Sequence, residues 1–151
     1  MRVTVCAVGR LKAGPERTLI ERFSKRLAWP FDIREVEERR KLPAPELAQR
    51  EADLLDAACP AGAVRVVLDE TGRQLGSVAL ADRIGQWRDG GRDVAFFIGG
   101  AGGLAAGIRD AADLTLSFGQ ATWPHMLVRV MLVEQIYRCQ EILAGHPYHR
   151  D

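Results

Sequence analysis

The chain has 151 residues, 47% of them hydrophobic, and a net charge of only +1. A chain of this length can bury one core of ordinary size, but two would need disulfides or metal ions, so we expect a single domain over residues 1–151. The near-neutral charge excludes a protein that holds nucleic acid through overall basicity.

The pattern of the first residues predicts no targeting signal. The apolar run from Val3 to Val8 is short, is followed at once by Arg10, and lacks a cleavage site of small residues, so we expect neither a signal peptide nor a membrane span. The cysteines are odd in number, widely separated and set in apolar patterns, which predicts reduced thiols. We therefore expect a cytoplasmic protein without a membrane partner.

The charge is distributed unevenly. Residues 1–50 contain 12 Lys and Arg against 7 Asp and Glu, whereas residues 51–151 contain 9 against 13. The first third of the chain is therefore a candidate surface for an anionic partner. The alternative is that its basic residues only solvate the outer side of a helix; these are Arg17, Arg22, Lys25 and Arg26.

Strand and helix patterns alternate along the chain. In order, we expect a strand at 3–8, a helix at 15–28, a strand at 31–36, a helix at 45–58, a strand at 64–68, a helix at 77–88, a strand at 94–98, a short helix at 104–112, a strand at 114–118 and a helix at 125–143. We expect the turn residues Asp69 to Gly72 to end the third strand, and Val78 to face inward from the third helix. This alternation predicts an α/β layered domain with a mainly parallel sheet of five to six strands.

The last helix is unusually apolar. In residues 127–143, 11 of 17 residues are apolar, which exceeds what one core-facing stripe requires. We expect one face to cover the sheet and another, carrying Val133 and Ile136, to pack against a second copy of the chain as a homodimer. Burial of the helix within one subunit is the alternative.

Two glycine-rich turns, Gly99–Gly103 and Gly119–Pro124, each follow a predicted strand and precede a predicted helix. Both therefore lie at strand carboxyl ends, where open α/β sheets bind ligands. The first turn is not a dinucleotide fingerprint or a phosphate-binding loop with Gly-Lys-Ser/Thr, because its glycines are spaced G-G-x-G-G and no such lysine follows. The alternative is a tight turn with a structural role only.

The C-terminal tail carries side chains suited to nucleic-acid chemistry. Tyr148 can stack on a base, His149 can move a proton and Arg150 can bind a phosphate. A disordered polar end is the alternative. The spacing of Cys139, His146 and His149 fits no ordinary zinc pattern, so we expect no metal, and no serine lies in a G-x-S-x-G elbow.

Several of these segments resemble the bacterial ribosomal RNA large subunit methyltransferase H family. The matching segments cover the whole chain and are densest after residue 93; they are Val5-x-Ala7-Val8-Gly9, Leu68-Asp69-x-x-Gly72, Ile98-Gly99-Gly100, Thr122-x-Pro124-His125, Val128-Arg129-Val130, Glu134-Gln135-x-Tyr137-Arg138 and Pro147-Tyr148-His149-Arg150. The resemblance implies a SPOUT fold, in which the C-terminal part of the chain forms a deep trefoil knot.

The resemblance also implies an activity: S-adenosylmethionine-dependent methylation of N3 of a pseudouridine in helix 69 of 23S ribosomal RNA, in the 70S ribosome or its large subunit. In the tail, which would reach the pocket of the partner subunit, His149 would handle the N3 proton, Arg150 would stabilise the anion or a phosphate, and Tyr148 would stack on the base. The implied cofactor contacts are Leu68, Gly100, Gly119, Gln120, Ala121, Thr122, Trp123 and Pro124. The alternatives are a SPOUT enzyme acting on transfer RNA and a noncatalytic ribosome-binding module.

Overall fold

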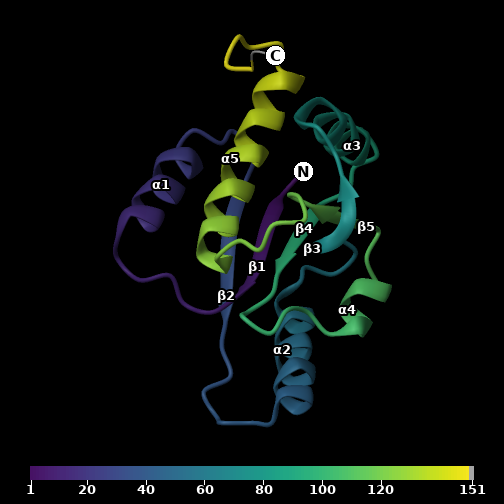
Figure 1. Ribbon diagram of the computed structural model, residues 1–151. Coiled ribbons are helices and arrows are strands. Elements are labelled where there is room, and N and C mark those ends of the chain that lie inside the picture. Colours follow the sequence, from purple (N-terminus) through teal and green to yellow (C-terminus); the bar gives the residue numbers. More distant parts are fainter. Residues whose placement is uncertain (150–151) are drawn as a thin grey trace.

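The computed structural model describes residues 1–149, which form an α/β fold around one parallel sheet (Figure 1). The strands are β1 (Val3–Val8), β2 (Phe31–Val36), β3 (Val64–Gln74), β4 (Val94–Ile98) and β5 (Leu114–Ser117). They lie in the order β2-β1-β4-β3-β5, and every neighbouring pair is parallel. The predicted fold class is therefore confirmed, and all strand carboxyl ends meet at one edge of the sheet.

Helices cover both faces of this sheet. They are α1 (Pro15–Ser24), α2 (Ala44–Ala58), α3 (Ser77–Asp89), α4 (Ala106–Asp110) and α5 (His125–Leu143). Figure 1 shows α5 lying across one face between α1 and α3, with α2 and α4 toward the other end of the molecule. Successive side chains of each strand enter different cores: Val5 and Phe96 pack with α3 and α5, whereas Cys6 and Phe97 pack with α2 and α4. Both faces are thus buried, as is usual for a parallel sheet.

Most of the apolar surface of α5 is buried within one chain. Ile136 packs in the core between α5, α3 and the sheet, and Val133 packs with Ile20 of α1. Both Val133 and Ile136 are fully buried. The expectation that these residues face a second copy is therefore wrong, because α1 and α3 flank the helix on its two sides.

α1 ends four residues earlier than the sequence pattern predicts. The side-chain amide of Gln140 on α5 accepts a hydrogen bond from the Ala28 N–H (2.7 Å) and donates one to the Arg26 carbonyl (3.2 Å). These backbone groups therefore bond to another helix rather than continuing α1. A contact over 112 residues of sequence decides where the helix stops.

β3 does not end at Asp69. It pairs with β5 up to Leu68, leaves the ladder, and pairs again from Arg73, so that Leu68 and Arg73 both lie opposite Leu116. A Cβ atom on Gly72 would lie 2.7 Å from the carbonyl carbon and oxygen of Thr115, so only glycine fits where the excursion returns to the ladder. The turn residues predicted from sequence form this excursion, but the strand continues beyond them.

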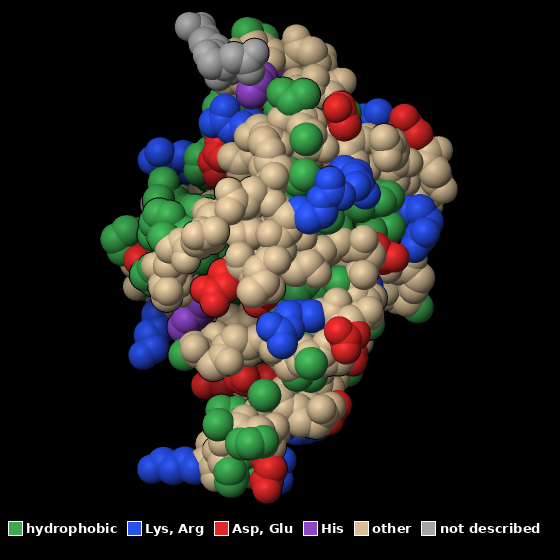
Figure 2. All heavy atoms as spheres, turned by 45° about the vertical axis from the view of Figure 1, so that its right-hand side comes forward, with side chains coloured by type: hydrophobic (Ala, Val, Ile, Leu, Met, Phe, Trp, Pro, Cys, Tyr) green, Lys and Arg blue, Asp and Glu red, His purple; other side chains and the backbone are tan. Residues whose placement is uncertain are grey.

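Other expectations are refined in detail. Val78 is 46% exposed, so its predicted inward orientation is wrong. Arg17 on α1 pairs with Glu21 (3.2 Å), and Arg26, just after α1, stacks over the ring of Tyr137 (4.4 Å). On the side of the molecule away from α1, Figure 2 shows acidic and basic side chains interspersed. An anionic partner for the first third of the chain stays a prediction, as does the trefoil knot.

No helix within residues 1–149 is long and apolar enough to cross a membrane.

Candidate functional site

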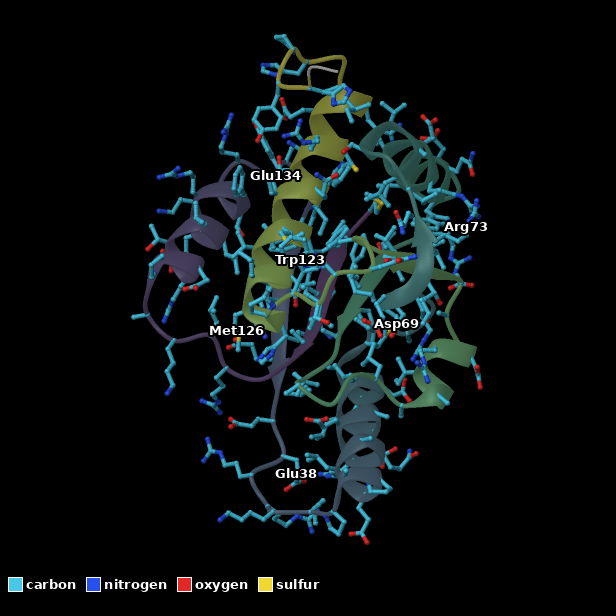
Figure 3. The ribbon with its side chains drawn as sticks, viewed as in Figure 1. Glu38, Asp69, Arg73, Trp123, Met126 and Glu134 are labelled. Atoms are coloured by element: carbon cyan, nitrogen blue, oxygen red, sulfur yellow. The ribbon has the colours of Figure 1, made fainter. Side chains whose placement is uncertain are left out.

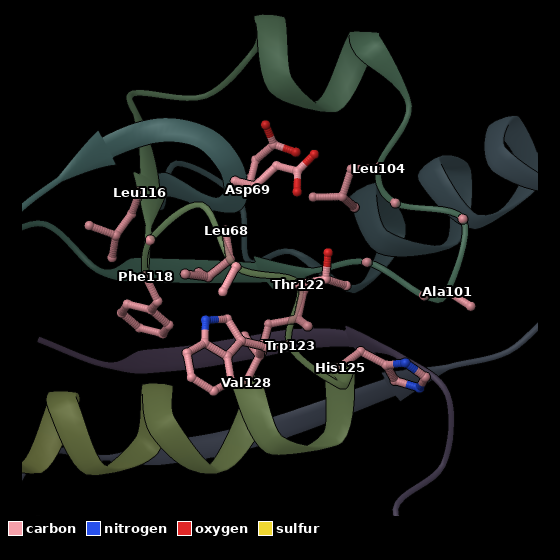
Figure 4. A pocket seen from close by; sticks show the side chains of 18 residues that line it. Leu68, Asp69, Ala101, Leu104, Leu116, Phe118, Thr122, Trp123, His125 and Val128 are labelled. Carbon is pink, nitrogen blue, oxygen red and sulfur yellow. The ribbon is translucent and has the colours of Figure 1, made fainter.

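A cavity of about 420 Å³ opens at the carboxyl edge of the sheet (Figure 4). It lies where β4 and β5 end and α5 begins, beside the excursion of β3, so its walls come from this excursion and from the turns that follow β4 and β5. The lining residues are Leu68–Glu70, Ile98–Leu104, Leu116, Phe118, Gly119, Ala121–Trp123, His125 and Val128. The two glycine-rich turns therefore meet at one site, as the sequence predicted.

The first glycine turn folds tightly on itself. The Gly103 N–H donates to the Gly100 carbonyl (3.0 Å), and Gly103 has a φ of +78°, which favours glycine. A Cβ on Gly99 would lie 2.9 Å from the Leu104 side chain and 3.0 Å from the backbone of Gly103. Crowding excludes a side chain at Gly99, and the backbone conformation disfavours one at Gly103, so this wall of the cavity is largely main chain.

Gly100 lies against the opposite core of the sheet. A Cβ on Gly100 would lie 3.0 Å from Cγ1 of Val8 and 3.3 Å from Oε2 of Glu51 on α2. Burial raises the pKa of the Glu51 carboxyl. A side chain added at Gly100 must therefore displace β1 or α2 side chains.

The second turn is anchored to the β3 excursion. The Ser117 hydroxyl accepts a hydrogen bond from the Gly119 N–H (3.0 Å) and donates to the Glu70 carbonyl (3.2 Å). Gly119 has a φ of +107°, a conformation that L side chains rarely adopt. This anchoring presents the residues after Gly119 to the cavity.

Six of the eight residues that the family resemblance assigned to cofactor binding line the cavity: Leu68, Gly100, Gly119, Ala121, Thr122 and Trp123. The other two, Gln120 and Pro124, belong to the same turn but do not line it. Pro124 instead precedes the first residue of α5, a position where its fixed φ suits the start of a helix.

The sequence did not assign the ionisable side chains of the cavity, Asp69, Glu70 and His125, to the site. Oδ2 of Asp69 accepts hydrogen bonds from the Thr71 N–H (3.1 Å) and the Thr71 hydroxyl. A signal was available, because Asp69 and Glu70 directly follow the apolar run predicted as a strand. Asp69 and His125 also lie in the family motifs, but no binding role was inferred for them.

The tail lies at the other end of α5. The Tyr148 hydroxyl donates to Oε1 of Glu134 (3.1 Å), which also accepts from Arg138 (2.7 Å), and the Tyr148 ring packs against Tyr137 with centroids 4.8 Å apart. Burial and then the bond to Glu134 raise the pKa of Tyr148. His149 is partly buried beside it.

The tail and the cavity of one chain are separate. Neither Tyr148 nor His149 lines the cavity. The Tyr148 hydroxyl bonds to Glu134, midway along α5, whereas α5 contributes its first residues to the cavity lining. Figure 3 shows Glu134 further along α5 than Met126, which lies at the start of the helix. The structure therefore does not bring Tyr148 or His149 to the cavity of the same chain, and Arg150 lies outside the described residues.

Comparison with known proteins identifies the class. A family model described as "Predicted SPOUT methyltransferase" matches residues 1–149, which places the chain in the SPOUT class of methyltransferases. Among solved structures, the chain is similar to the SpoU methyltransferase AviRb from Streptomyces viridochromogenes, with 14% identity and a TM-score of 0.46, over 96% of this chain and 60% of that chain.

Curated relatives narrow the class. Proteins named "Ribosomal RNA large subunit methyltransferase H" are 58% identical in Rhodospirillum centenum and 55% identical in Paramagnetospirillum magneticum, each over 99% of both chains. The relative of that name from Paracoccus denitrificans is 53% identical over the full length of both chains. The chain therefore belongs to the ribosomal RNA large subunit methyltransferase H family, and the resemblance found in its sequence motifs is confirmed.

Proposed function

We propose that this chain uses S-adenosylmethionine to methylate N3 of a pseudouridine in helix 69 of 23S ribosomal RNA, in the 70S ribosome or its large subunit. It would act in the cytoplasm as one SPOUT methyltransferase domain spanning residues 1–151. The relatives' name, which specifies the RNA of the large ribosomal subunit, supports the substrate. The observation that carries the proposal is the glycine-lined cavity at the carboxyl edge of the sheet.

The residues present fit this cofactor. The cavity volume of about 420 Å³ lies within the range of small-molecule sites. Leu68, Leu116 and Phe118 offer apolar walls for an adenine ring, and the main chain of the two glycine turns offers close-range hydrogen-bonding groups. Leu68, Gly100, Gly119, Ala121, Thr122 and Trp123 would hold the cofactor. When bound, the cofactor would supply a methyl group attached to a positively charged sulfonium sulfur, and the leaving group would be the uncharged thioether.

The protein has two further tasks in this reaction. It must hold the ring nitrogen in line with the methyl carbon, and it must accept the proton of N3, which is protonated at neutral pH. We assign the proton to His149, the stabilisation of the ring anion or a phosphate to Arg150, and stacking on the base to Tyr148. The bond from N3 to the methyl carbon forms as the sulfur–carbon bond breaks.

The proposal requires a homodimer, because neither Tyr148 nor His149 lines the cavity of its own chain. A second copy can supply the tail to that cavity. Trp123 (42% exposed) and Leu127 (37% exposed) present apolar surface beside the cavity and on the first turns of α5, and a partner can cover it. This interface is distinct from the buried residues Val133 and Ile136.

The first experiment combines calorimetry with single-turnover methylation of ribosomes. We expect saturable binding of S-adenosylmethionine, and methylation of ribosomes but not of free transfer RNA. Deletion of residues 146–151 should abolish methylation and retain cofactor binding. Absence of saturable heat would favour a noncatalytic ribosome-binding module, and methylation of transfer RNA would favour the other SPOUT alternative.

The role of His149 is tested by substitution. His149→Ala should lower the single-turnover rate by roughly 10² to 10⁴, with partial recovery as the pH rises because more N3 is then ionised. His146→Ala is the matched control; His146 follows α5, its Nδ1 lies 2.9 Å from Oε2 of Glu141 on that helix, and it is given no role in proton transfer. A rate for His149→Ala close to that of the wild type from about pH 6 to 9 would remove His149 as the base.

The shared site is tested by mixing two inactive variants. Gly100→Val distorts the first glycine turn, because the added side chain must displace Val8 or Glu51, and deletion of residues 146–151 removes the tail. If the tail acts across subunits, mixed dimers regain activity, because one of their two composite sites is intact. Activity that does not recover after subunit exchange, demonstrated by tagged chains, would contradict the composite site.

A further inference from the structure

The cavity is lined by negative side chains that the proposed chemistry does not use. The lining side chains that titrate are Asp69, Glu70 and His125, and no Lys or Arg lines it within residues 1–149. The nearest cation to Asp69 is Arg109 of α4, whose Nη1 lies 3.8 Å from Oδ1. The wall formed by the β3 excursion is therefore acidic, and one cation partly offsets its charge.

The Asp69 carboxylate is held through one of its two oxygens. Its side chain is 15% exposed, against 41% for Arg109. Oδ2 accepts from both the N–H and the hydroxyl of Thr71, which fixes the carboxylate, whereas no group within residues 1–149 donates a hydrogen bond to Oδ1. Figure 4 shows Asp69 on the side of the cavity opposite Trp123. Oδ1 is therefore a partly exposed acceptor in the cavity wall, to which a bound ligand can donate a hydrogen bond in place of water.

We propose that Asp69, with Glu70 beside it, makes the cavity sensitive to the charge of the cofactor; this rests on the proposed function. Oδ1 of Asp69 accepts a hydrogen bond from the bound cofactor, and the two carboxylates favour the sulfonium form. Methyl transfer leaves the bonding electron pair on sulfur, so the product, S-adenosylhomocysteine, carries one positive charge fewer. The cavity therefore binds the product more weakly than the methyl donor, which assists product release.

The experiment is isothermal titration of each protein with S-adenosylmethionine and with S-adenosylhomocysteine, at low ionic strength and constant pH. The measured quantity is the ratio of the two affinities. Asp69→Asn should lower that ratio by roughly fivefold to thirtyfold, the effect of one unit charge at about 8 Å for an effective dielectric constant between about 40 and 20. Added salt should lower the wild-type ratio as well.

Two further variants make the result decisive. Asp110→Asn on α4 removes the same charge outside the lining and should leave the ratio within about twofold, since an exposed charge is screened by solvent. Arg109→Gln removes the cation beside Asp69 and should raise the ratio, which a loss of folding cannot imitate. If Asp69→Asn does not fold, as judged by circular dichroism, Arg109→Gln decides alone.

The possible outcomes distinguish the role of Asp69 from the proposed methyltransferase activity. Wild-type protein that binds both ligands, with a ratio unchanged in Asp69→Asn and in Arg109→Gln, overturns the role of Asp69 and leaves the methyltransferase proposal intact. Wild-type protein that binds neither ligand overturns both. A ratio that moves in opposite directions in Asp69→Asn and Arg109→Gln, and not in Asp110→Asn, supports charge sensing by Asp69.

Discussion

Replacing Arg129 by Met tests how the start of α5 is fastened to the sheet. The Arg129 side chain is 1% exposed, and its guanidinium donates to Oε2 of Glu35 on β2 (2.6 Å) and to the carbonyls of Val8 (3.3 Å) and Gly9 (3.1 Å). The same oxygen of Glu35 accepts from the Leu11 N–H (2.7 Å). One buried cation therefore joins α5, the end of β1 and β2, next to the residues that line the cavity.

The expected loss of stability depends on the environment in which Arg129→Met leaves the Glu35 carboxylate. Removing one partner of a buried ion pair costs about 3 to 5 kcal/mol. Glu35 is 34% exposed and can recover water, while Met retains the apolar packing of the arginine stem, so we expect the lower end of that range. For a chain of this length, ~3 kcal/mol lowers Tm by roughly 6 to 12 °C.

The assay is urea unfolding followed by circular dichroism at one protein concentration, since dimerisation would make stability depend on concentration. Arg17→Met is the control: Arg17 is exposed and pairs with Glu21 on its own helix (3.2 Å), so its loss should change stability by less than about 0.5 kcal/mol. Adding Glu35→Gln to Arg129→Met should cost less than ~1 kcal/mol more, because the ion pair is already broken. A loss below ~1 kcal/mol for Arg129→Met itself would refute the reasoning.

Three other perturbations test the fold and the site. Gly72→Ala places a Cβ atom 2.7 Å from the Thr115 backbone, so it should cost at least about 1 to 3 kcal/mol of stability in urea unfolding; an unchanged midpoint would contradict this close approach. Burial raises the pKa of Cys6 and of Cys139 to about 12, so both remain uncharged thiols at about pH 8 and should resist iodoacetamide until the protein is unfolded; mass spectrometry counts the labels, and rapid labelling of the folded protein would disprove their burial. Trp123 lines the cavity, so S-adenosylmethionine should change the tryptophan fluorescence, and Trp123→Phe should remove most of that change; an equal change in both proteins would place the ligand elsewhere.

Local patterns were sufficient to predict the main elements and the edge of the sheet that carries the site. Strand and helix periodicity placed α5 at His125–Leu143, as observed, and the parallel α/β class followed from the alternation of elements. The glycine turns at Gly99–Gly103 and Gly119–Pro124 predicted the cavity correctly, because carboxyl ends of parallel strands meet at one edge whatever the strand order. These features are determined by residues that are close together in the sequence, so the pattern of residue types is sufficient to predict them.

Only the tertiary structure decided the features that depend on contacts between distant segments. Hydrogen bonds from Gln140 determine where α1 stops, and pairing with β5 resumes in β3 after Gly72. The residues of α5 that the sequence suggested would face a second copy are covered by α1 and α3. The same holds for Asp69: the sequence shows a turn residue, and the fold turns it into a fixed acceptor in a cavity wall. The physical reason is that a backbone group or an apolar face can be satisfied by several partners, and the choice among them depends on which segments the completed sheet brings together.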